Sequence, residues 1–437
     1  MRKINIALCG FGTVGKGVYE ILKKNKKILQ RRAQLDFSIK KVLVKNINKK
    51  RDAELEFTTD FSDIANDKSI DIVVELIGGT TLAETIILDA LKRKKSVVTA
   101  NKALLALKGF NLARVAEKYN SSLYYEASVA GGIPIIKVFK EAMTSNNIEY
   151  FYGILNGTSN YILTKMSSFG EPFAKVLKNA QAKGYAESDP SFDIEGVDAA
   201  HKLAILISLA YDAEIDFNDI YVEGISSISS EDIKFAREFG YTIKLLAISK
   251  KNGEDIEGRV HPVLIKKDTV LSFINGVFNA VYIKGDFIGP SLYYGKGAGS
   301  FPTATSVFSD IIDAATNINK HNSFAKPVFT CSVSRMKKVQ LKSMLQLRTK
   351  YYLRFSVLDK PGVLSKISGI LGEYSISLEA VIQKGRVNES NGKNSVPIVM
   401  ITHESLEKNI IDALSIIDKL DIVKEKTFFI RIEDFNE

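Results

Sequence analysis

The stretch K-I-N-I-A-L-C-G-F-G-T-V-G, residues 3–15, decides the fold of the first part of the chain. Its apolar start predicts a buried strand, and Gly10, Gly12 and Gly15 follow with the spacing G-x-G-x-x-G. A helix is predicted directly after these glycines. A glycine motif between a strand and a helix is the context in which a dinucleotide pyrophosphate binds at a helix N-terminus. The alternative is a glycine turn that binds no ligand.

Strands and helices alternate up to about residue 130. Strands are predicted at 39–44, 70–76, 96–99 and 123–126, and helices at 81–93 and 111–119. This alternation is typical of a doubly wound parallel sheet of the Rossmann type. The predicted cofactor-binding residues of this sheet are Gly10, Phe11, Gly12, Thr13, Val14 and Gly15.

The end of the second predicted strand discriminates between the two nicotinamide cofactors. An acidic residue there would bind the ribose diol of NAD. This chain instead has Val44, Lys45 and Asn46, followed by a basic run at 49–51. Because a cation suits a 2′-phosphate, Lys45 predicts a preference for NADPH, with NADH as the second choice. The alternative for Lys45 is a surface lysine.

A second stretch, G-Y-A-E-S-D-P-S-F-D-I-E-G-V-D-A-A-H-K at 184–202, gathers carboxylates just before an apolar helix. Asp198 and Lys202 are four positions apart, so they share one face of that helix. A carboxylate cluster can bind a substrate ammonium group, and a lysine among carboxylates can transfer a proton. Together with the glycine motif, this predicts a dehydrogenase that acts on an amino acid. The alternative is an ordinary surface ion pair on the helix.

The rest of the chain predicts three further parts after a dinucleotide-binding domain at 1–130. Residues 131–316 predict an α+β catalytic domain whose last helix returns to the first domain. A polar, basic stretch at 317–349 predicts a linker. Residues 350–437 have the order β-α-β-β-α-β, which is typical of a ferredoxin-like module.

Composition excludes several classes of protein. The net charge of +10 is concentrated in the first fifty residues, but no nucleic-acid-binding motif accompanies it, so a solvated surface is expected. No apolar run has the ~20 residues of a membrane helix, and no signal peptide is apparent. Two cysteines, Cys9 and Cys331, do not make a disulfide framework. A cytoplasmic enzyme with no membrane or nucleic-acid partner is therefore expected.

Several motifs in this order resemble those of homoserine dehydrogenases. They are L-C-G-F-G-T-V-G (8–15), V-T-A-N-K (98–102), Y-E-A-S-V-A-G-G-I-P (125–134), N-G-T-S-N-Y-I-L (156–163), G-Y-A-E-S-D-P (184–190), E-G-V-D-A-A-H-K (195–202) and G-K-G-A-G-S-F-P-T-A (295–304). The tail, with D-K-P-G-V-L at 359–364, is similar to an ACT domain. No aspartate-kinase domain is apparent, which indicates the monofunctional form.

The resemblance implies a reaction and a role for each matching residue. The family reduces aspartate semialdehyde to homoserine with NAD(P)H, and Lys202 matches its catalytic lysine. The matches to its substrate-binding residues are Glu187, Asp193 and Asp198. The resemblance places Lys102 near both nicotinamide and substrate, and it makes the Thr158 hydroxyl a donor to either the substrate or the nicotinamide ribose. Gly184 and Gly299 match positions where the backbone approaches the cofactor; the alternative for both is an ordinary turn glycine.

The resemblance also implies a monovalent cation, usually sodium, in the loop that joins the first two domains. The match falls on Glu126, Val129, Gly131 and Ile133. An acidic side chain among backbone carbonyls suits a hard cation that prefers oxygen ligands. The alternative for Glu126 is a surface carboxylate at a strand end.

The ACT-like tail implies feedback inhibition by threonine, and the family implies a homodimer or homotetramer. The alternative for the tail is a dimerisation module that binds no ligand. Two other interpretations of the whole chain remain open. One is a sibling dehydrogenase acting on another small amino-acid aldehyde or ketone. The other is a non-catalytic amino-acid sensor, which would be expected to have lost Glu187, Asp198 or Lys202.

Overall fold

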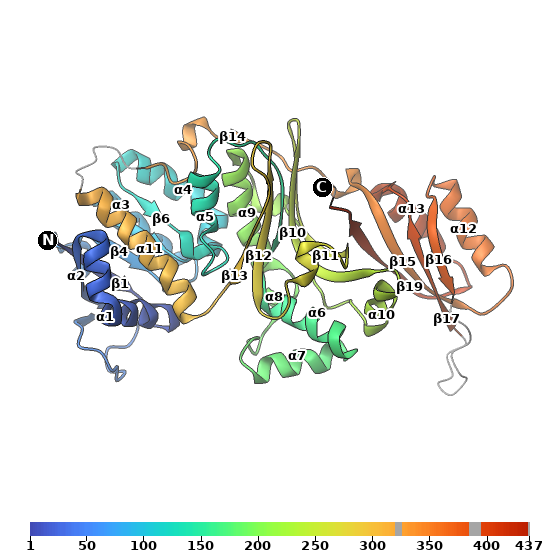
Figure 1. Ribbon diagram of the computed structural model, residues 1–437, viewed down its shortest axis with the longest axis horizontal. Coiled ribbons are helices and arrows are strands. Elements are labelled where there is room, and N and C mark those ends of the chain that lie inside the picture. Colours follow the sequence, from blue (N-terminus) through green and yellow to red (C-terminus); the bar gives the residue numbers. More distant parts are fainter. Residues whose placement is uncertain (320–325, 384–394, 436–437) are drawn as a thin grey trace.

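The computed structural model describes residues 1–319, 326–383 and 395–435. The chain forms three units in a row (Figure 1). The N-terminal unit lies at one end, the ferredoxin-like unit lies at the other, and a large mixed sheet lies between them. Among the described residues, no helix has the length and apolar character needed to cross a membrane.

The first unit is a parallel sheet with strand order β3-β2-β1-β4-β5-β6. Its strands are β1 (Arg2–Cys9), β2 (Leu35–Leu43), β3 (Phe57–Thr58), β4 (Ile72–Glu75), β5 (Ser96–Thr99) and β6 (Leu123–Tyr124). All neighbouring strands run parallel. The strand order reverses between β1 and β4, which is the place where such sheets bind ligands. The predicted Rossmann-type sheet is confirmed.

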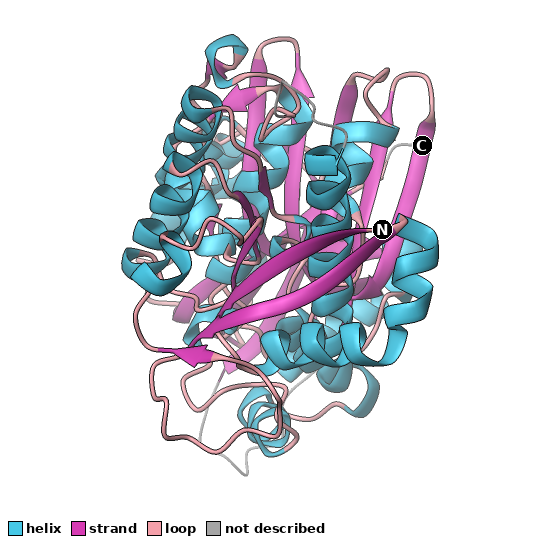
Figure 2. Cartoon of the chain, turned by 90° about the vertical axis from the view of Figure 1, so that its left-hand side faces the viewer, coloured by secondary structure: helices cyan, strands magenta, loops and turns pink. Residues whose placement is uncertain are grey.

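Helices cover both faces of this sheet, as seen from its own end of the molecule in Figure 2. They are α1 (Thr13–Ala33), α2 (Ser62–Ala65), α3 (Thr81–Lys92), α4 (Lys102–Tyr119) and α11 (Ser300–Asn319). Strands β4 and β5 are buried along their whole length, as expected for parallel strands between helices.

Helix α4 begins earlier than the sequence predicted. The predicted start near residue 111 was wrong, because the helix begins at Lys102. The Asn101 side chain caps it by accepting a hydrogen bond from the Leu104 N–H at 3.1 Å. Gly109 lies inside the helix, close to the Phe329 ring. Packing here overrides the helix-breaking tendency of a glycine.

The central unit is built on antiparallel strands backed by helices. Its long strands are β7 (Ile148–Ile154), β10 (Tyr241–Asn252), β11 (Asp255–Lys266), β12 (Phe278–Gly285) and β13 (Gly289–Lys296). Short strands are β8 (Ala213–Glu214) and β9 (Tyr221–Val222). Its helices are α5 (Ile135–Lys137), α6 (Gly157–Phe169), α7 (Phe173–Ala182), α8 (Ser191–Ile194), α9 (Val197–Tyr211) and α10 (Ser230–Glu238).

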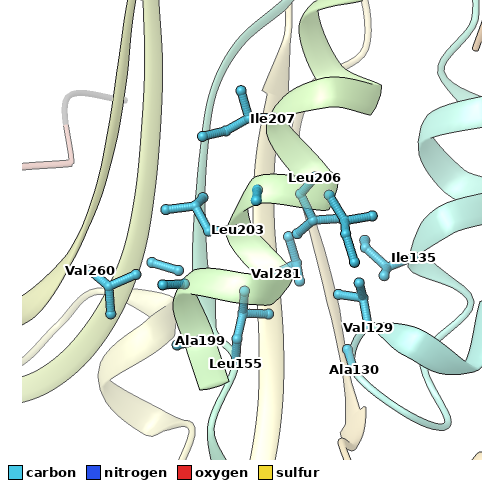
Figure 3. Close-up of a cluster of buried hydrophobic side chains, with 14 of the residues drawn as sticks. Val129, Ala130, Ile135, Leu155, Ala199, Leu203, Leu206, Ile207, Val260 and Val281 are labelled. Carbon is cyan, nitrogen blue, oxygen red and sulfur yellow. The ribbon is translucent and has the colours of Figure 1, made fainter. Parts of the chain in front are cut away.

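Helix α9 is the centre of this unit, and Figure 3 shows the apolar cluster around it. Leu203, Leu206 and Ile207 of α9 are buried between the sheet and the turn that carries Val129 and Ile135. Asp198 and Lys202 belong to the same helix and are also buried. The apolar packing of α9 therefore fixes the position of both charged groups.

Helix α11 returns to the first unit and packs along α1. Gly17 makes this approach close: a Cβ on Gly17 would lie 2.8 Å from the Ser300 carbonyl oxygen. The described part of the segment predicted as a linker, residues 326–349, contacts the central unit. Within it, Val328, Phe329 and Leu341 are buried, and β14 (Lys337–Lys338) pairs with β8. Residues 320–325 of the predicted linker lie outside the described residues.

The C-terminal unit has the predicted order β-α-β-β-α-β. Its elements are β15 (Arg348–Leu358), α12 (Val363–Glu373), β16 (Leu378–Gln383), β17 (Ser395–Thr402), β18 (Ser405–Leu406), α13 (Glu407–Ile417) and β19 (Val423–Glu433). The sheet order β19-β15-β17-β16 is that of a ferredoxin-like fold. Strand β19 also pairs in parallel with β11, so one continuous sheet joins this unit to the central one.

Candidate active site

A cleft of about 1020 Å³ lies over the glycine loop, at the carboxyl ends of β1, β2 and β4. Gly10 has φ +110°, and a Cβ there would lie 2.7 Å from the Leu76 carbonyl oxygen. A Cβ on Gly15 would overlap the Gly10 carbonyl. Gly12 faces open space, with nothing within 4 Å of a Cβ. Gly10 and Gly15 thus shape the loop, and Gly12 leaves room for a ligand's phosphates.

The opposite wall of the cleft is basic. Lys45, Asn46, Lys49, Lys50 and Arg51 line it. Arg51 is held in place, because its Nη2 donates to the Asn46 carbonyl at 2.7 Å and its guanidinium lies 5.0 Å from the Phe57 ring centre. Lys45 is exposed at this wall.

Glu75 supports the floor of the cleft, and sequence reasoning missed it. This carboxylate is fully buried at the end of β4. It accepts hydrogen bonds from the N–H groups of Ile77 and Gly78, at 2.8 and 3.1 Å, and from the Thr99 hydroxyl at 2.7 Å. The available signal was an acid at the end of an apolar strand, three residues before two consecutive glycines.

Asp198 lies between two lysines. Its Oδ2 is 2.7 Å from Lys202 Nζ, and its Oδ1 is 2.8 Å from Lys102 Nζ. Lys202 also donates to the Leu155 carbonyl at 2.6 Å. Lys102 follows β5 at the carboxyl edge of the first sheet, whereas Asp198 and Lys202 belong to the central unit. The centre therefore joins the two units at the edge where the cleft opens.

Burial and charge tune this centre. Burial lowers the pKa of Lys202, and the neighbouring Lys102 lowers it too, while Asp198 opposes both. Burial alone would raise the pKa of Asp198, but Lys202 and Lys102 hold it well below its usual range. Asp198 is therefore a carboxylate at neutral pH, and Lys202 gives up its proton more readily than a surface lysine.

Asn156 connects Asp198 to Asp193. Its Nδ2 lies 2.7 Å from Asp193 Oδ1 and 2.9 Å from Asp198 Oδ2. The Thr158 hydroxyl lies 3.0 Å from Asp193 Oδ2 and 2.7 Å from the Tyr185 carbonyl. Asn156 also caps α6 by accepting from the Ser159 N–H at 2.8 Å. Sequence reasoning selected Thr158 from N-G-T but missed Asn156, whose side chain holds the two acids together.

Glu187, Gly184 and Gly299 complete the set of predicted residues. Glu187 has an exposed side chain, and its carbonyl accepts from Gln181 Nε2 at 3.1 Å. Gly184 has φ +73° just after α7 and is exposed. Gly299 has φ +123° and precedes Ser300, whose hydroxyl donates to the Thr13 carbonyl of the glycine loop at 2.7 Å. Gly299 therefore lies beside the dinucleotide loop.

The predicted cation residues form one buried turn. Glu126 accepts from the N–H groups of Ile136 and Lys137, each at 2.9 Å. Burial raises its pKa to about 7 against these two hydrogen bonds. Ala130 and Gly131 both have positive φ, at +54° and +49°. Val129 and Ile133 are buried beside them. Among the residues that the structure describes, no group of three His, Cys, Asp or Glu side chains is placed to hold a metal ion.

A parallel sheet with a glycine-lined cleft at its switch point defines a dinucleotide-dependent dehydrogenase, and the lysine-flanked carboxylate at the same edge fits that class. Comparison with models of protein families identifies the family within this class. The homoserine dehydrogenase NAD-binding domain matches residues 10–126, the homoserine dehydrogenase catalytic domain matches 134–312, and the ACT domain matches 351–421. The chain belongs to the homoserine dehydrogenase family and is an oxidoreductase.

Two relatives and one solved structure match this chain over nearly its whole length, and a second solved structure matches part of it. Homoserine dehydrogenases from Neisseria gonorrhoeae and Bacillus subtilis are 42% and 40% identical, and the alignments cover at least 99% of each chain. A crystal structure of a homoserine dehydrogenase from Thiobacillus denitrificans superposes with a TM-score of 0.94 at 42% identity, covering 99% of both chains. A hyperthermophilic archaeal homoserine dehydrogenase in complex with NADPH has a TM-score of 0.60 at 26% identity, covering 72% of this chain and 98% of that one.

Proposed function

We propose that this enzyme reduces L-aspartate 4-semialdehyde to L-homoserine in threonine, methionine and isoleucine biosynthesis. The reaction needs a hydride at the carbonyl carbon and a proton at its oxygen. A bound nicotinamide supplies the hydride, and the chain has to supply the proton. The observation that carries the proposal is the buried ammonium of Lys202 beside Asp198, at the edge of a dinucleotide cleft.

In this proposal Lys202 is the proton donor. Its ammonium stabilises the negative charge that develops on the substrate oxygen and then donates a proton to it. Asp198 keeps Lys202 charged, since an anion 2.7 Å away favours the protonated form. Lys102 is the second cation at the centre and orients the same carboxylate from the other unit.

The acidic segment binds the amino-acid part of the substrate. Glu187, Asp193 and Asp198 offer carboxylates to the substrate ammonium, and the Thr158 hydroxyl completes this side of the site. Asp193 and Asp198 are already held by Asn156, so they bind without a large loss of conformational entropy. Glu187 is exposed on the same segment and contacts the ammonium from the solvent side.

NADPH is the proposed cofactor, held by the glycine loop and by Gly184 and Gly299. The basic wall with Lys45 suits a 2′-phosphate, and the archaeal relative was solved with NADPH. NADH is expected to bind more weakly. Michaelis constants for the two cofactors in wild type and Lys45→Glu test this choice. A higher constant for NADPH than for NADH in wild type would reject it.

A monovalent cation, sodium in the first place, is proposed at the turn of Glu126, Val129, Gly131 and Ile133. The residues fit in their chemistry, because Glu126 is a buried carboxylate in a buried turn whose backbone supplies carbonyl oxygens. The melting temperature in sodium chloride is expected to exceed that in choline chloride of equal ionic strength. No difference between the two salts would contradict the site.

Threonine is the proposed effector of the ACT domain, and the assembly is a homodimer or homotetramer. The turn before α12 carries Gly362 at φ +86°, and the N-terminus of a helix after a glycine turn suits an amino-acid carboxylate. Threonine is expected to lower the rate in wild type and to act more weakly in Gly362→Ala, with serine as the control. If threonine neither binds nor inhibits, the ACT domain is better explained as a dimerisation module that binds no ligand.

Loss of NADPH absorbance with aspartate semialdehyde, compared between wild type and Lys202→Ala, tests the reaction and the donor together. Turnover in wild type and a large loss of kcat in the variant are expected. Turnover that survives in the variant would move the donor to Lys102. NADPH binding without turnover in wild type would indicate a sibling dehydrogenase with another substrate.

A further inference from the structure

Two strands that pair at the seam between the central unit and the ACT domain carry a buried ion-pair network. Strand β19 pairs with β11 from Val263 to Ile265. Arg431 of β19 is buried and donates from Nη1 to Glu223 Oε2 at 2.8 Å and from Nε to Glu407 Oε2 at 2.7 Å. Glu407 belongs to the ACT domain, whereas Glu223 belongs to the central unit. Arg431 thus joins the two units through Glu223.

Glu223 is held firmly on its own side of the seam. It follows β9, which pairs with β11 through Tyr221 and Val222. Its N–H donates to the Val260 carbonyl at 2.8 Å, and its carboxylate accepts from the Tyr221 hydroxyl at 2.8 Å. Tyr221 also contacts Arg431, whose Nη2 lies 3.3 Å from the hydroxyl. A displacement of β19 therefore acts directly on residues 221–223.

The next residues touch the acidic substrate segment. Gly224 packs on the Ile194–Glu195 backbone so closely that a Cβ there would overlap both residues. The Ile225 N–H donates to the Ile194 carbonyl at 2.8 Å. On the other side, Gly196 would place a Cβ 3.2 Å from Val222 Cγ1. The turn 194–196 is therefore packed tightly against β9 and the residues that follow it, Glu223 and Gly224.

This turn separates the two acids of the active site. Asp193 immediately precedes it, and Asp198 follows it in the first turn of α9. Asn156 binds both carboxylates. A small shift of the turn therefore changes the distance between the two carboxylates and their hydrogen bonds to Asn156. We propose that Glu223 is a positioning residue that transmits the placement of ACT strand β19, through Gly224, to the substrate-binding acids. This inference rests on the proposed function, since it names the same acids.

A matched control exists at the same seam. Lys250 pairs with Glu433 of β19 at 2.6 Å, and its side chain is 33% exposed, against 30% for Glu223. Glu223 and Lys250 each make one ion pair across the seam, with Arg431 and Glu433 respectively. Each of these two partners also has a second ion pair, Arg431 with Glu407 and Glu433 with Arg259. Lys250 lies on β10, away from the Gly224–Ile194 contact. Glu223→Gln and Lys250→Gln thus differ in their link to the substrate segment. They also differ in the ion pair that remains, because Arg259–Glu433 crosses the seam and Arg431–Glu407 lies within the ACT domain.

The experiment compares full-length wild type, Glu223→Gln and Lys250→Gln by steady-state kinetics at saturating NADPH. Glu223→Gln is expected to raise KM for aspartate semialdehyde by about three- to ten-fold, the range of long-range coupling mutations, with a smaller change in kcat. Lys250→Gln is expected to leave this KM within about two-fold of wild type, as for a mutation that does not change the coupling. Equal changes of this KM in the two variants would overturn the proposal, because the seam would then affect the stability of the protein and not the substrate site in particular.

Hydrogen exchange gives a second readout that needs no substrate. Peptides that cover residues 191–200 are expected to exchange faster in Glu223→Gln than in wild type, and at the wild-type rate in Lys250→Gln. Unchanged exchange of this segment in Glu223→Gln would reject the coupling whatever the kinetics. If wild type does not reduce aspartate semialdehyde, the proposed function fails, and exchange alone then decides the coupling.

Discussion

The Nζ atoms of Lys102 and Lys202 bind the two oxygens of the same carboxylate, Asp198, at 2.8 and 2.7 Å. One lysine comes from the first unit and the other from the central unit. Asp198 and Lys202 are buried, whereas the Lys102 side chain is 35% exposed. Lys102 affects the protonation of Lys202 through the carboxylate that they share. Because Lys102 belongs to the other unit, the protonation of Lys202 depends on how the two units are placed.

Asp198→Asn removes the anion between the two lysines. Lys202 then loses the interaction that favours its charged form, so its pKa falls further and less of it is protonated at neutral pH. We expect kcat to fall by about 10²–10⁴-fold, the usual contribution of a general acid. Steady-state assays with saturating NADPH measure this. Asp198→Glu is the control, and a kcat in Asp198→Asn close to wild type would show that the carboxylate is not needed for the proton transfer.

The pH profile follows from the lowered pKa of Lys202. A proton donor works in its charged form, so the reductive kcat is expected to fall as pH rises through the folded-state pKa. Because burial lowers this pKa, the fall begins at a lower pH than for an ordinary lysine. The oxidative direction needs the neutral amine and is expected to rise over the same window. A profile that stays flat up to the ordinary pKa of lysine would argue against Lys202 as the donor.

The sequence predicted those parts of the site that depend on local spacing. The glycine loop at 10–15 and the Asp198–Lys202 pair are both set within a single turn, so their geometry follows from the spacing alone. The bond from Lys102 to Asp198 joins two units, and no local pattern encodes it. Asn156 was missed for the same reason, because its partners Asp193 and Asp198 lie on other elements.

The ACT module illustrates the same limit. Its β-α-β-β-α-β order was predicted, since each element has its own apolar periodicity. The pairing of β19 with β11 could not be predicted, because β19 is an ordinary last strand within its own module. The ion pair between Arg431 and Glu223 depends on that pairing, so no local sequence pattern could predict it either.

Two glycines of the dinucleotide loop are expected to respond differently to alanine. Gly12→Ala adds a methyl group to open space, so the protein should fold with an almost unchanged melting temperature. The methyl group fills the room left for the phosphates, and KM for NADPH should rise about ten-fold or more, since over 1.4 kcal/mol of contact is lost. Gly15→Ala places a methyl group against the Gly10 carbonyl, so it should lower the melting temperature itself.

Thermal unfolding and cofactor titration of both variants separate the two effects. A Gly12→Ala protein that melts well below wild type would show that Gly12 serves the fold. A Gly12→Ala protein that binds NADPH like wild type would place the pyrophosphate elsewhere.

Glu433 is expected to make the seam between the ACT domain and the central unit sensitive to acid. Burial alone would raise its pKa, but Arg259 and Lys250 lower it to about 2. The folded-state pKa is thus below the ordinary value, so this carboxylate stabilises the protein above the ordinary value and loses that contribution as pH falls toward about 2. Glu433→Gln leaves Arg259 buried with Glu257, at 3.1 Å, as its remaining carboxylate partner, so the loss at neutral pH should be at most about 3–5 kcal/mol. Urea unfolding at neutral pH and at pH values below the ordinary glutamate pKa measures the difference, which should shrink as the acid protonates in wild type.

Glu254→Gln, at an exposed ion pair with Lys337, is the control and should change stability little at either pH. A constant difference between wild type and Glu433→Gln across this range would mean that folding does not lower the pKa of Glu433.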